Sequence, residues 1–246
     1  MAACEITEPI VGERLDEVAI PARFNGPPTS ANGGYACGLV AAAIGPSARV
    51  RLSQPPPLDV PLTRRRDEDG AVRLLQGDVP IAEGRAARPD VAVPELPSWA
   101  AAIRAAHAFV GRRPGHHAFP TCFVCGTYRE GDGLRIHPGP AGEDGLLASP
   151  WVPAPELASD GVVEPVFVWA ALDCPSGFAC MSLGTRIVLA TMTARLEASV
   201  RPGRPYIVTG WPIAGEGRKH WAGSAIHEPG GRRIAVAEAL WITPRG

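Results

Sequence analysis

One carboxylate stands alone in an apolar part of the sequence. Asp173 is the only acidic or basic residue between Pro165 and Gly184, within the run VFVWAALDCPSGFACM. Burying an unpaired carboxylate is so unfavourable that such a group is normally paired, hydrogen-bonded or protonated. Asp173 is therefore a candidate general base or nucleophile. A structural role stays open, because Pro175 would break the helix there and Asp173 could cap a new turn.

A second candidate site is the start of a helix. Asn32-Gly33-Gly34 leads into the apolar run YACGLVAAAIG, which Gly45-Pro46 stops. An Asn cap and a Gly-Pro stop predict a helix over about residues 33–44. The first N–H groups of a helix lack partners within it and carry partial positive charge, and glycine lets a ligand come close. Asn32 could equally be a plain cap, and the glycines could serve tight helix packing.

A CxxC pair raises the question of a metal. Cys122-Phe-Val-Cys125 has three histidines nearby in the sequence, His116, His117 and His137. CxxC is half of a zinc site, but a closed structural site needs four ligands, and the imidazoles could complete it only if the loop folds back. A redox CxxC needs a strand-to-helix setting that this segment lacks. We therefore expect no metal here.

Composition narrows the class of protein. The chain has 246 residues, of which 46% are hydrophobic and 20% charged, and a formal net charge of −1. This balance is typical of a globular protein and argues against nucleic-acid binding, which needs a surplus of positive charge. No segment reaches the roughly 18 consecutive apolar residues of a membrane span, and Met1–Ile10 lacks the pattern of a secretory signal. Six cysteines are too few for a disulfide scaffold, so we expect a cytoplasmic protein with reduced thiols.

The elements that position these residues follow a pattern that occurs twice, a buried helix accompanied by strands. An apolar helix without a polar face needs a sheet curled around it, and pairing two such sheets edge to edge protects an edge of each. We therefore expect an α+β fold with two antiparallel sheets, each wrapped around a central helix. The expected helices are 33–44, 98–110 in a connector and 166–181, and the expected strands are 49–53, 58–64, 71–75, 79–86, 133–137, 146–150, 185–200, 206–214, 219–227 and 232–243.

Three segments resemble a known superfamily. NGG at a helix start, CFVCGT…GDGLRI before a strand and GRKHWAGSAIHEPGGRRIAVAEALWI near the end are similar to hotdog-fold acyl-CoA thioesterases, in particular their fused, double-hotdog members. The resemblance covers nearly the whole chain, most closely residues 118–246. It implies an N-terminal hotdog over 1–95, a connector with a short helix over 96–120 and a C-terminal hotdog over 121–246. It also implies association, such as a homodimer of double hotdogs.

The resemblance assigns roles to both candidate sites. In many such thioesterases a His/Asn-Gly-Gly helix start polarises the thioester carbonyl, and a carboxylate on the partner hotdog's helix acts as base or nucleophile. Asn32, Gly33 and Gly34 match the first element, but Ala41 stands nine positions later, where the acid would be. Asp173 matches the acid, but nine positions before it is Glu164 rather than an Asn-Gly-Gly motif. The two halves would thus form one complete composite site and one degenerate site.

Weaker candidates complete the expected site. By the same resemblance, Arg218 and Lys219 would lie near the phosphates of CoA, although they could equally be solvated charges at a hairpin. Ser176 could bind the attacking water, whereas Cys174 lacks a histidine partner and is not expected to be a nucleophile.

Three functions follow, in order of preference. The first is hydrolysis of a small or medium acyl thioester without a cofactor. The second is binding of an acyl thioester without turnover, because halves of fused repeats can degenerate. The third, a hydratase, relies on an Asp–His pair, and no histidine accompanies Asp173 or Asn32 in the sequence.

Overall fold

The computed structural model describes residues 12–129, 131–181 and 186–245. Residues 1–10, for which we expect no secretory signal, and Thr185, the expected start of a strand, lie outside the described residues. The described helices are η1 (Ala22–Phe24), α1 (Gly33–Ala42), α2 (Trp99–His107), η2 (Val110–Arg112), η3 (Pro155–Leu157) and α3 (Pro165–Cys180). Among them, none is both long and apolar enough to cross a membrane.

The strands of the first half are β1 (Glu13–Val18), β2 (Ser47–Leu52), β3 (Leu62–Arg66), β4 (Val72–Gln76) and β5 (Val79–Ala86). Those of the second half are β6 (Gly139–Pro140), β7 (Leu147–Trp151), β8 (Ala158–Ser159), β9 (Val162–Val163), β10 (Val188–Leu196), β11 (Tyr206–Glu216), β12 (Lys219–His227) and β13 (Arg233–Ile242). The pattern of a helix with strands thus recurs, as the sequence predicts, and the α+β class is confirmed.

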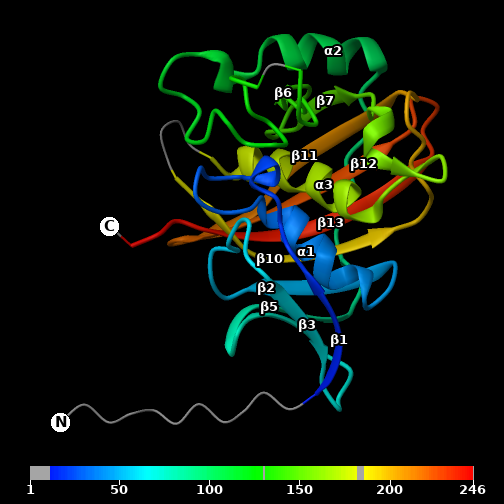
Figure 1. Ribbon diagram of the computed structural model, residues 1–246. Coiled ribbons are helices and arrows are strands. Elements are labelled where there is room, and N and C mark those ends of the chain that lie inside the picture. The colour runs from blue at the N-terminus through cyan, green and yellow to red at the C-terminus, as the bar shows by residue number, and fades with distance from the viewer. Residues whose placement is uncertain (1–11, 130, 182–185, 246) are drawn as a thin grey trace.

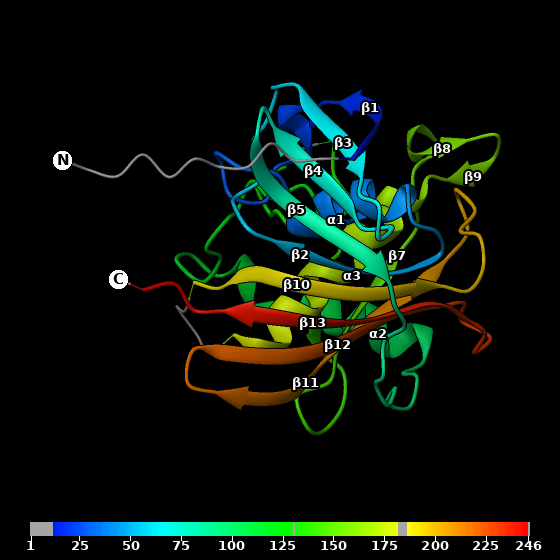
Figure 2. The same cartoon turned by 90° about the horizontal axis from the view of Figure 1, so that it is seen from below.

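Eleven of the described strands form one large antiparallel sheet. Its order is β1-β3-β4-β5-β2-β10-β13-β12-β11-β7-β6, and β8 and β9 form a separate small hairpin. The halves join where β2 pairs with β10, with Arg49 opposite Thr193 (Figure 2). The two sheets expected from the sequence are thus joined edge to edge into one continuous sheet, because their edge strands satisfy each other's backbone donors and acceptors.

The helices α1 and α3 fill the space inside this curved sheet. α1 contacts β2, β4 and β5, α3 contacts β11, β12 and β13, and the two helices contact each other (Figure 1). Glycines allow the close approach, since a Cβ on Gly38 would lie 2.9 Å from the Cα of Val166. Each helix therefore meets the sheet on one side and the other helix on the opposite side, which explains why neither has a polar stripe.

The break expected at Pro175 does not occur. α3 continues through it to Cys180, and Pro175 is buried. The helix loses one backbone hydrogen bond there, because proline has no N–H. Since no new turn begins at Pro175, the idea that Asp173 caps one is wrong.

Two further predictions differ from the structure. Residues 133–137 are not a strand but a segment that holds the CxxC loop, in which the N–H of Leu134 donates to the carbonyl of Phe123 at 2.8 Å and that of Ile136 to Val124 at 2.9 Å. The strand β1 was not expected from the sequence. Its residues ERLDEV are mostly charged and exposed and lack the alternating apolar pattern of a half-buried strand.

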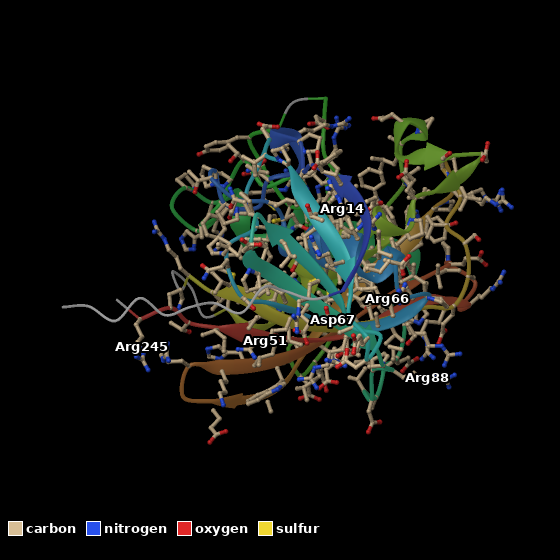
Figure 3. All side chains as sticks on the ribbon, turned by 60° about the horizontal axis from the view of Figure 1, so that its bottom comes forward. Arg14, Arg51, Arg66, Asp67, Arg88 and Arg245 are labelled. Atoms are coloured by element: carbon tan, nitrogen blue, oxygen red, sulfur yellow. The ribbon has the colours of Figure 1, made fainter. Side chains whose placement is uncertain are left out.

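The charge of β1 suits an edge strand. Arg14 pairs with Glu17 at 2.9 Å, and nearby Arg73 of β4 pairs at 3.0 Å with Asp67, which follows β3. Figure 3 shows Arg14, Arg66 and Asp67 on this part of the sheet. An exposed ion pair such as Arg14–Glu17 contributes less than about 1 kcal/mol to stability. The greater effect of such charges is to discourage other chains from pairing with the edge.

The connector helix forms where the sequence predicts it. The hydroxyl oxygen of Ser98 accepts the N–H of Ala101 at 3.2 Å and caps α2. Ala102 and Ala105 of α2 pack against Ala148 and Ile207 of the sheet. The boundaries at residues 95 and 120 stay a prediction.

Candidate active site

Asp173 and the start of α1 meet in the structure. The carboxylate lies on α3, is 3% exposed, and its Oδ2 accepts the side-chain N–H of Asn32 at 2.6 Å and the backbone N–H of Gly34 at 3.1 Å. These contacts join residues that are 141 and 139 positions apart in the chain. The lone acid of one half therefore faces the helix start of the other, as the composite site requires.

Asn32 both caps α1 and holds the carboxylate. Its Oδ1 accepts the N–H of Tyr35 at 2.9 Å while its Nδ2 donates to Asp173. An amide side chain can accept at one end and donate at the other, whereas an ionised Asp could cap the helix but has no hydrogen to donate to a second carboxylate. Asn32 is therefore a helix cap and also a hydrogen-bond donor to the carboxylate of Asp173, so the two roles do not exclude each other.

The buried surroundings of Asp173 make ionisation of its carboxyl group unfavourable. Burial raises the pKa of Asp173 to about 7, although the N–H of Gly34 and the side chain of Asn32 act in the opposite direction. Oδ1 is buried and has no hydrogen-bond partner within the described part of the chain. An unpaired carboxylate oxygen of this kind is available to a water molecule or a substrate.

An apolar cavity of about 530 Å³ adjoins the carboxylate. Asp173, Asn32 and Gly33 form part of its wall, together with residues of β10, β13 and the loop before β6. Its apolar lining includes Leu52, Phe178, Met181, Ile187, Leu189 and Trp241. A cavity of this size and polarity suits a small organic ligand with an apolar part.

The two glycines differ in their roles. Gly33 is the first residue of α1 and lines the cavity, at a position where a helical N–H has no partner within the helix. Gly34 instead donates to Asp173, and a Cβ there would lie only 2.6 Å from the Cβ of Asp173 and the carbonyl oxygen of Trp169. The N–H of Gly34 is therefore occupied by the carboxylate, whereas Gly33 is the glycine of this pair that lines the cavity.

Ser176 lies in the helix wall rather than at the cavity. Its hydroxyl donates to the carbonyl of Asp173 at 2.7 Å and accepts the indole N–H of Trp241 at 3.0 Å. Ser176 is fully buried and is not among the residues that line the cavity. Its contacts suit a residue that positions Asp173 and Trp241 better than one that binds the attacking water.

Arg218 and Lys219 lie beside the rim of the cavity. Lys219 stands opposite Ile242 in the β12–β13 pair, and Ile242 lines the cavity. Arg218 donates to the carbonyl of Thr243 at 3.2 Å. Both side chains are exposed and neither lines the cavity itself, so they could contact only a ligand that extends out of it.

A second cavity lies where the degenerate site is expected. Ala41, which stands where the first half would carry the acid, and Pro165 at the start of α3 line a space of about 400 Å³. Proline has no N–H to offer a ligand, and alanine has no base. The asymmetry expected from the sequence therefore agrees with the residues present at the two cavities.

Sequence reasoning considered three cysteines separately and did not expect them to meet at the site. Cys122, Cys125 and Cys174 all line the main cavity, and the sulfurs of Cys122 and Cys174 are 3.7 Å apart. The position of Cys174 next to Asp173 was a usable signal. His117 does not complete a set with them, because its Nδ1 accepts the N–H of Phe119 and its Nε2 faces the carbonyl of Cys125, both at 3.1 Å.

His137 packs outside this cluster and should affect stability in acid. It stacks on Phe109 at 5.3 Å and contacts Arg112, and burial, aided by the charge of Arg112, lowers its pKa to about 4. An unfolded histidine titrates near 6.5. Between these two pKa values the unfolded state binds a proton more readily than the folded state does. The free energy of unfolding is therefore highest above pH 6.5, and this contribution is lost as the pH falls towards 4.

We expect His137→Phe to reduce this acid sensitivity. Between about pH 7.5 and 5, the wild type should lose about 1 kcal/mol more unfolding free energy than the variant, after allowance for the partial exposure of the imidazole. Urea denaturation at the two pH values measures the difference. An equal loss of unfolding free energy in both proteins would contradict a lowered pKa of His137 as the cause.

Comparisons with known proteins support the fold. No protein-family model matches the sequence, and no curated protein matches it significantly.

Among solved structures, a conserved protein of unknown function with hot dog fold from Alicyclobacillus acidocaldarius is 10% identical, with a TM-score of 0.64 over 94% of this chain and 93% of that one. An acyl-CoA thioesterase II, TesB2, from Mycobacterium marinum is 13% identical, with a TM-score of 0.61 over 94% and 93% of the two chains. A tesB protein of Mycobacterium avium subs. paratuberculosis is also 13% identical, with a TM-score of 0.60 over 92% and 91%. Since these likenesses extend over nearly the whole of each chain, the protein has the hotdog fold that these structures share.

Proposed function

We propose that this protein hydrolyses an acyl thioester, such as a small or medium acyl-CoA, at the composite site between its two halves. The observation that carries the proposal is the contact between Asp173 of α3 and the start of α1 at the wall of an apolar cavity. A carboxylate held by two donors on one oxygen and unpaired on the other suits a general base. Proteins of the same fold are named as thioesterases, among them the acyl-CoA thioesterase II of Mycobacterium marinum.

The proposed reaction uses water and the residues of the site. The thioester carbonyl lies against the N–H of Gly33, where the developing oxyanion receives a hydrogen bond and the partial positive charge of the helix end. Water attacks the carbonyl carbon and transfers a proton to Oδ1 of Asp173. As the tetrahedral intermediate collapses, the carbon–sulfur bond breaks, and the proton on Asp173 passes to the departing thiolate. The products are a carboxylic acid and a free thiol.

Asn32 and Gly34 position the base in this scheme. Both donate to Oδ2, so that Oδ1 is the oxygen left for water. The apolar lining holds the acyl chain and limits the access of bulk water. The CoA portion leaves the cavity across its rim towards Lys219 and Arg218.

A panel of acyl-CoAs tests the proposal directly. The purified protein is incubated with acyl-CoAs of increasing chain length, and free thiol is followed with a thiol reagent. We expect turnover well above the spontaneous rate for at least one short or medium acyl chain. Saturable binding of acyl-CoA, measured by calorimetry, without thiol release from any member would instead support the non-catalytic binding protein.

Arg218 and Lys219 should affect binding rather than chemistry. In the variant with both changed to Ala, we expect KM for acyl-CoA to rise about three- to tenfold with kcat unchanged, because exposed cations contribute up to about 1 kcal/mol each to holding a phosphate. An acyl-pantetheine substrate without the nucleotide phosphates should show no such change. Arg201→Ala is the matched control, since Arg201 instead donates to the carbonyl of Gly161. A KM for acyl-CoA that is unchanged in the double variant would remove both residues from the substrate path.

A further inference from the structure

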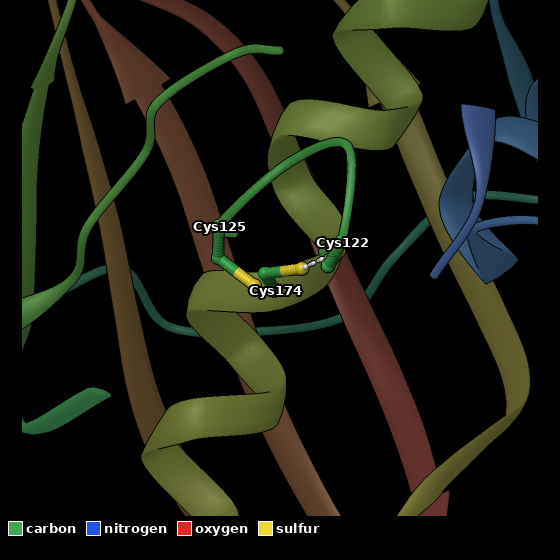
Figure 4. A group of neighbouring side chains, drawn as sticks. All are labelled: Cys122, Cys125 and Cys174. Carbon is green, nitrogen blue, oxygen red and sulfur yellow. Dashed lines mark hydrogen bonds between the residues drawn. The ribbon is translucent and has the colours of Figure 1, made fainter. Parts of the chain in front are cut away.

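Three cysteine sulfurs gather at the cavity wall. Cys122 and Cys125 come from the loop before β6 and Cys174 from α3, and Figure 4 shows the three side chains converging. Their Sγ atoms lie within 4.8 Å of one another, and Cys122 and Cys174 are 3.7 Å apart. The three residues are between 3% and 9% exposed. A buried group of three thiols is not required by the hydrolysis proposed above.

The spacing of the sulfurs suits a tetrahedral metal. Zinc binds thiolate sulfur at about 2.3 Å, which places two sulfurs of a tetrahedral site about 3.8 Å apart. The distance between Cys122 and Cys174 already matches this value, and Cys125 needs only a small movement to do so. Three soft thiolate ligands favour zinc over magnesium or calcium, which prefer oxygen.

The loop that carries two of the sulfurs is held in place. The N–H of Gly126 donates to the carbonyl of Cys122 at 2.8 Å, and a Cβ on Gly126 would lie 2.4 Å from that oxygen. The N–H of Phe123 donates to the carbonyl of Asn25 at 2.8 Å, which ties the loop to the first half of the chain. The glycine after CxxC thus permits a tight turn that keeps both sulfurs directed at α3.

We propose that Cys122, Cys125 and Cys174 bind one zinc ion through their sulfurs, with the fourth coordination position directed into the cavity. Each of the three residues lines the cavity, so a water molecule or a ligand atom could fill that position. The sequence argued against a metal because CxxC lacked further ligands nearby. The third ligand comes from α3, 52 positions after Cys122. The zinc site goes beyond the proposed hydrolysis and does not depend on it.

Metal content tests the proposal without an activity assay. Protein purified under reducing conditions is loaded with zinc, passed over a desalting column and analysed by inductively coupled plasma mass spectrometry. We expect about one zinc per chain, as for a three-cysteine site. The variants Cys122→Ser, Cys125→Ser and Cys174→Ser should each retain at least about tenfold less zinc. Cys180→Ser is the control and should retain the full amount, since Cys180 lies at the end of α3 outside the cluster.

Cobalt titration of the unmutated protein covers the case in which a variant fails to fold. Cobalt bound by three thiolates gives intense sulfur-to-metal charge-transfer bands and the visible bands of a tetrahedral site. Their absence, together with no retained zinc in the reduced wild-type protein, would overturn the proposal, as would full zinc retention in all three variants. The outcome is separate from that for hydrolysis, because Asp173→Asn should remove turnover and leave the zinc content unchanged.

Discussion

The variant Asp173→Asn is expected to lose at least about 10³-fold in kcat for acyl-CoA hydrolysis while remaining folded, as for removal of a general base. The amide oxygen can still accept from Asn32 and Gly34, so the contact between α1 and α3 is retained. Only the ability to take a proton from water disappears. Thiol release under single-turnover conditions, with circular dichroism to check the fold, measures both parts of the prediction.

The stability of this variant provides a second measurement. Replacing a buried carboxylate by a neutral amide removes a group that is costly to desolvate, so the thermal midpoint should not fall. Asp90→Asn, a change at an exposed carboxylate after β5, is the control for both activity and stability. Asp173→Ala, which also removes the hydrogen-bond acceptor, should be equally inactive. Turnover unchanged in either Asp173 variant would end the proposed mechanism.

Gly34→Ala is expected to damage both stability and activity. The added Cβ would lie 2.6 Å from the Cβ of Asp173 and from the carbonyl oxygen of Trp169, and neither backbone can yield without separating the helices. Overpacking of this kind costs about 1–3 kcal/mol. Because the same movement displaces the carboxylate from its two donors, we expect kcat to fall at least about 100-fold, in line with the sensitivity of catalysis to small misplacements.

Variants of two other glycines distinguish the effect on stability from the effect on activity. Gly38→Ala should destabilise the helix contact by a similar amount, since its Cβ would lie 2.9 Å from the Cα of Val166. Gly38 lies one turn along α1 from Gly34, and its Cβ would not meet Asp173, so this variant should retain most activity. Gly230→Ala meets open space and should change neither property. Chemical denaturation and thiol release on all three variants give the comparison. If Gly34→Ala and Gly38→Ala lost the same fraction of activity, the special role of Gly34 in holding the base would be refuted.

Local sequence patterns predicted most of the secondary structure. The two central helices and the long strands of the second half lie close to their expected positions, because apolar runs bounded by Gly, Pro and Asn specify them within a few residues. The charged edge strand β1 has no such signature. Residues 133–137 have a strand-like composition but bond instead to the loop at Phe123 and Val124, a partner that periodicity cannot reveal.

The sequence indicates which residues form the candidate site, but not how they are arranged in space. A lone Asp173 in an apolar helix and an Asn-Gly-Gly start already indicated chemistry, since both are unusual in their surroundings. Which N–H of α1 holds the carboxylate and which faces the cavity depends on how the two helices cross. The grouping of Cys122 and Cys125 with Cys174 depends likewise on the packing of a loop against a distant helix. The sequence alone thus determined which groups were available and on which elements they lie, because propensity and patterning are local. Only the tertiary structure decided which of them meet, because contacts between residues 52 to 141 positions apart depend on the packing of the whole fold.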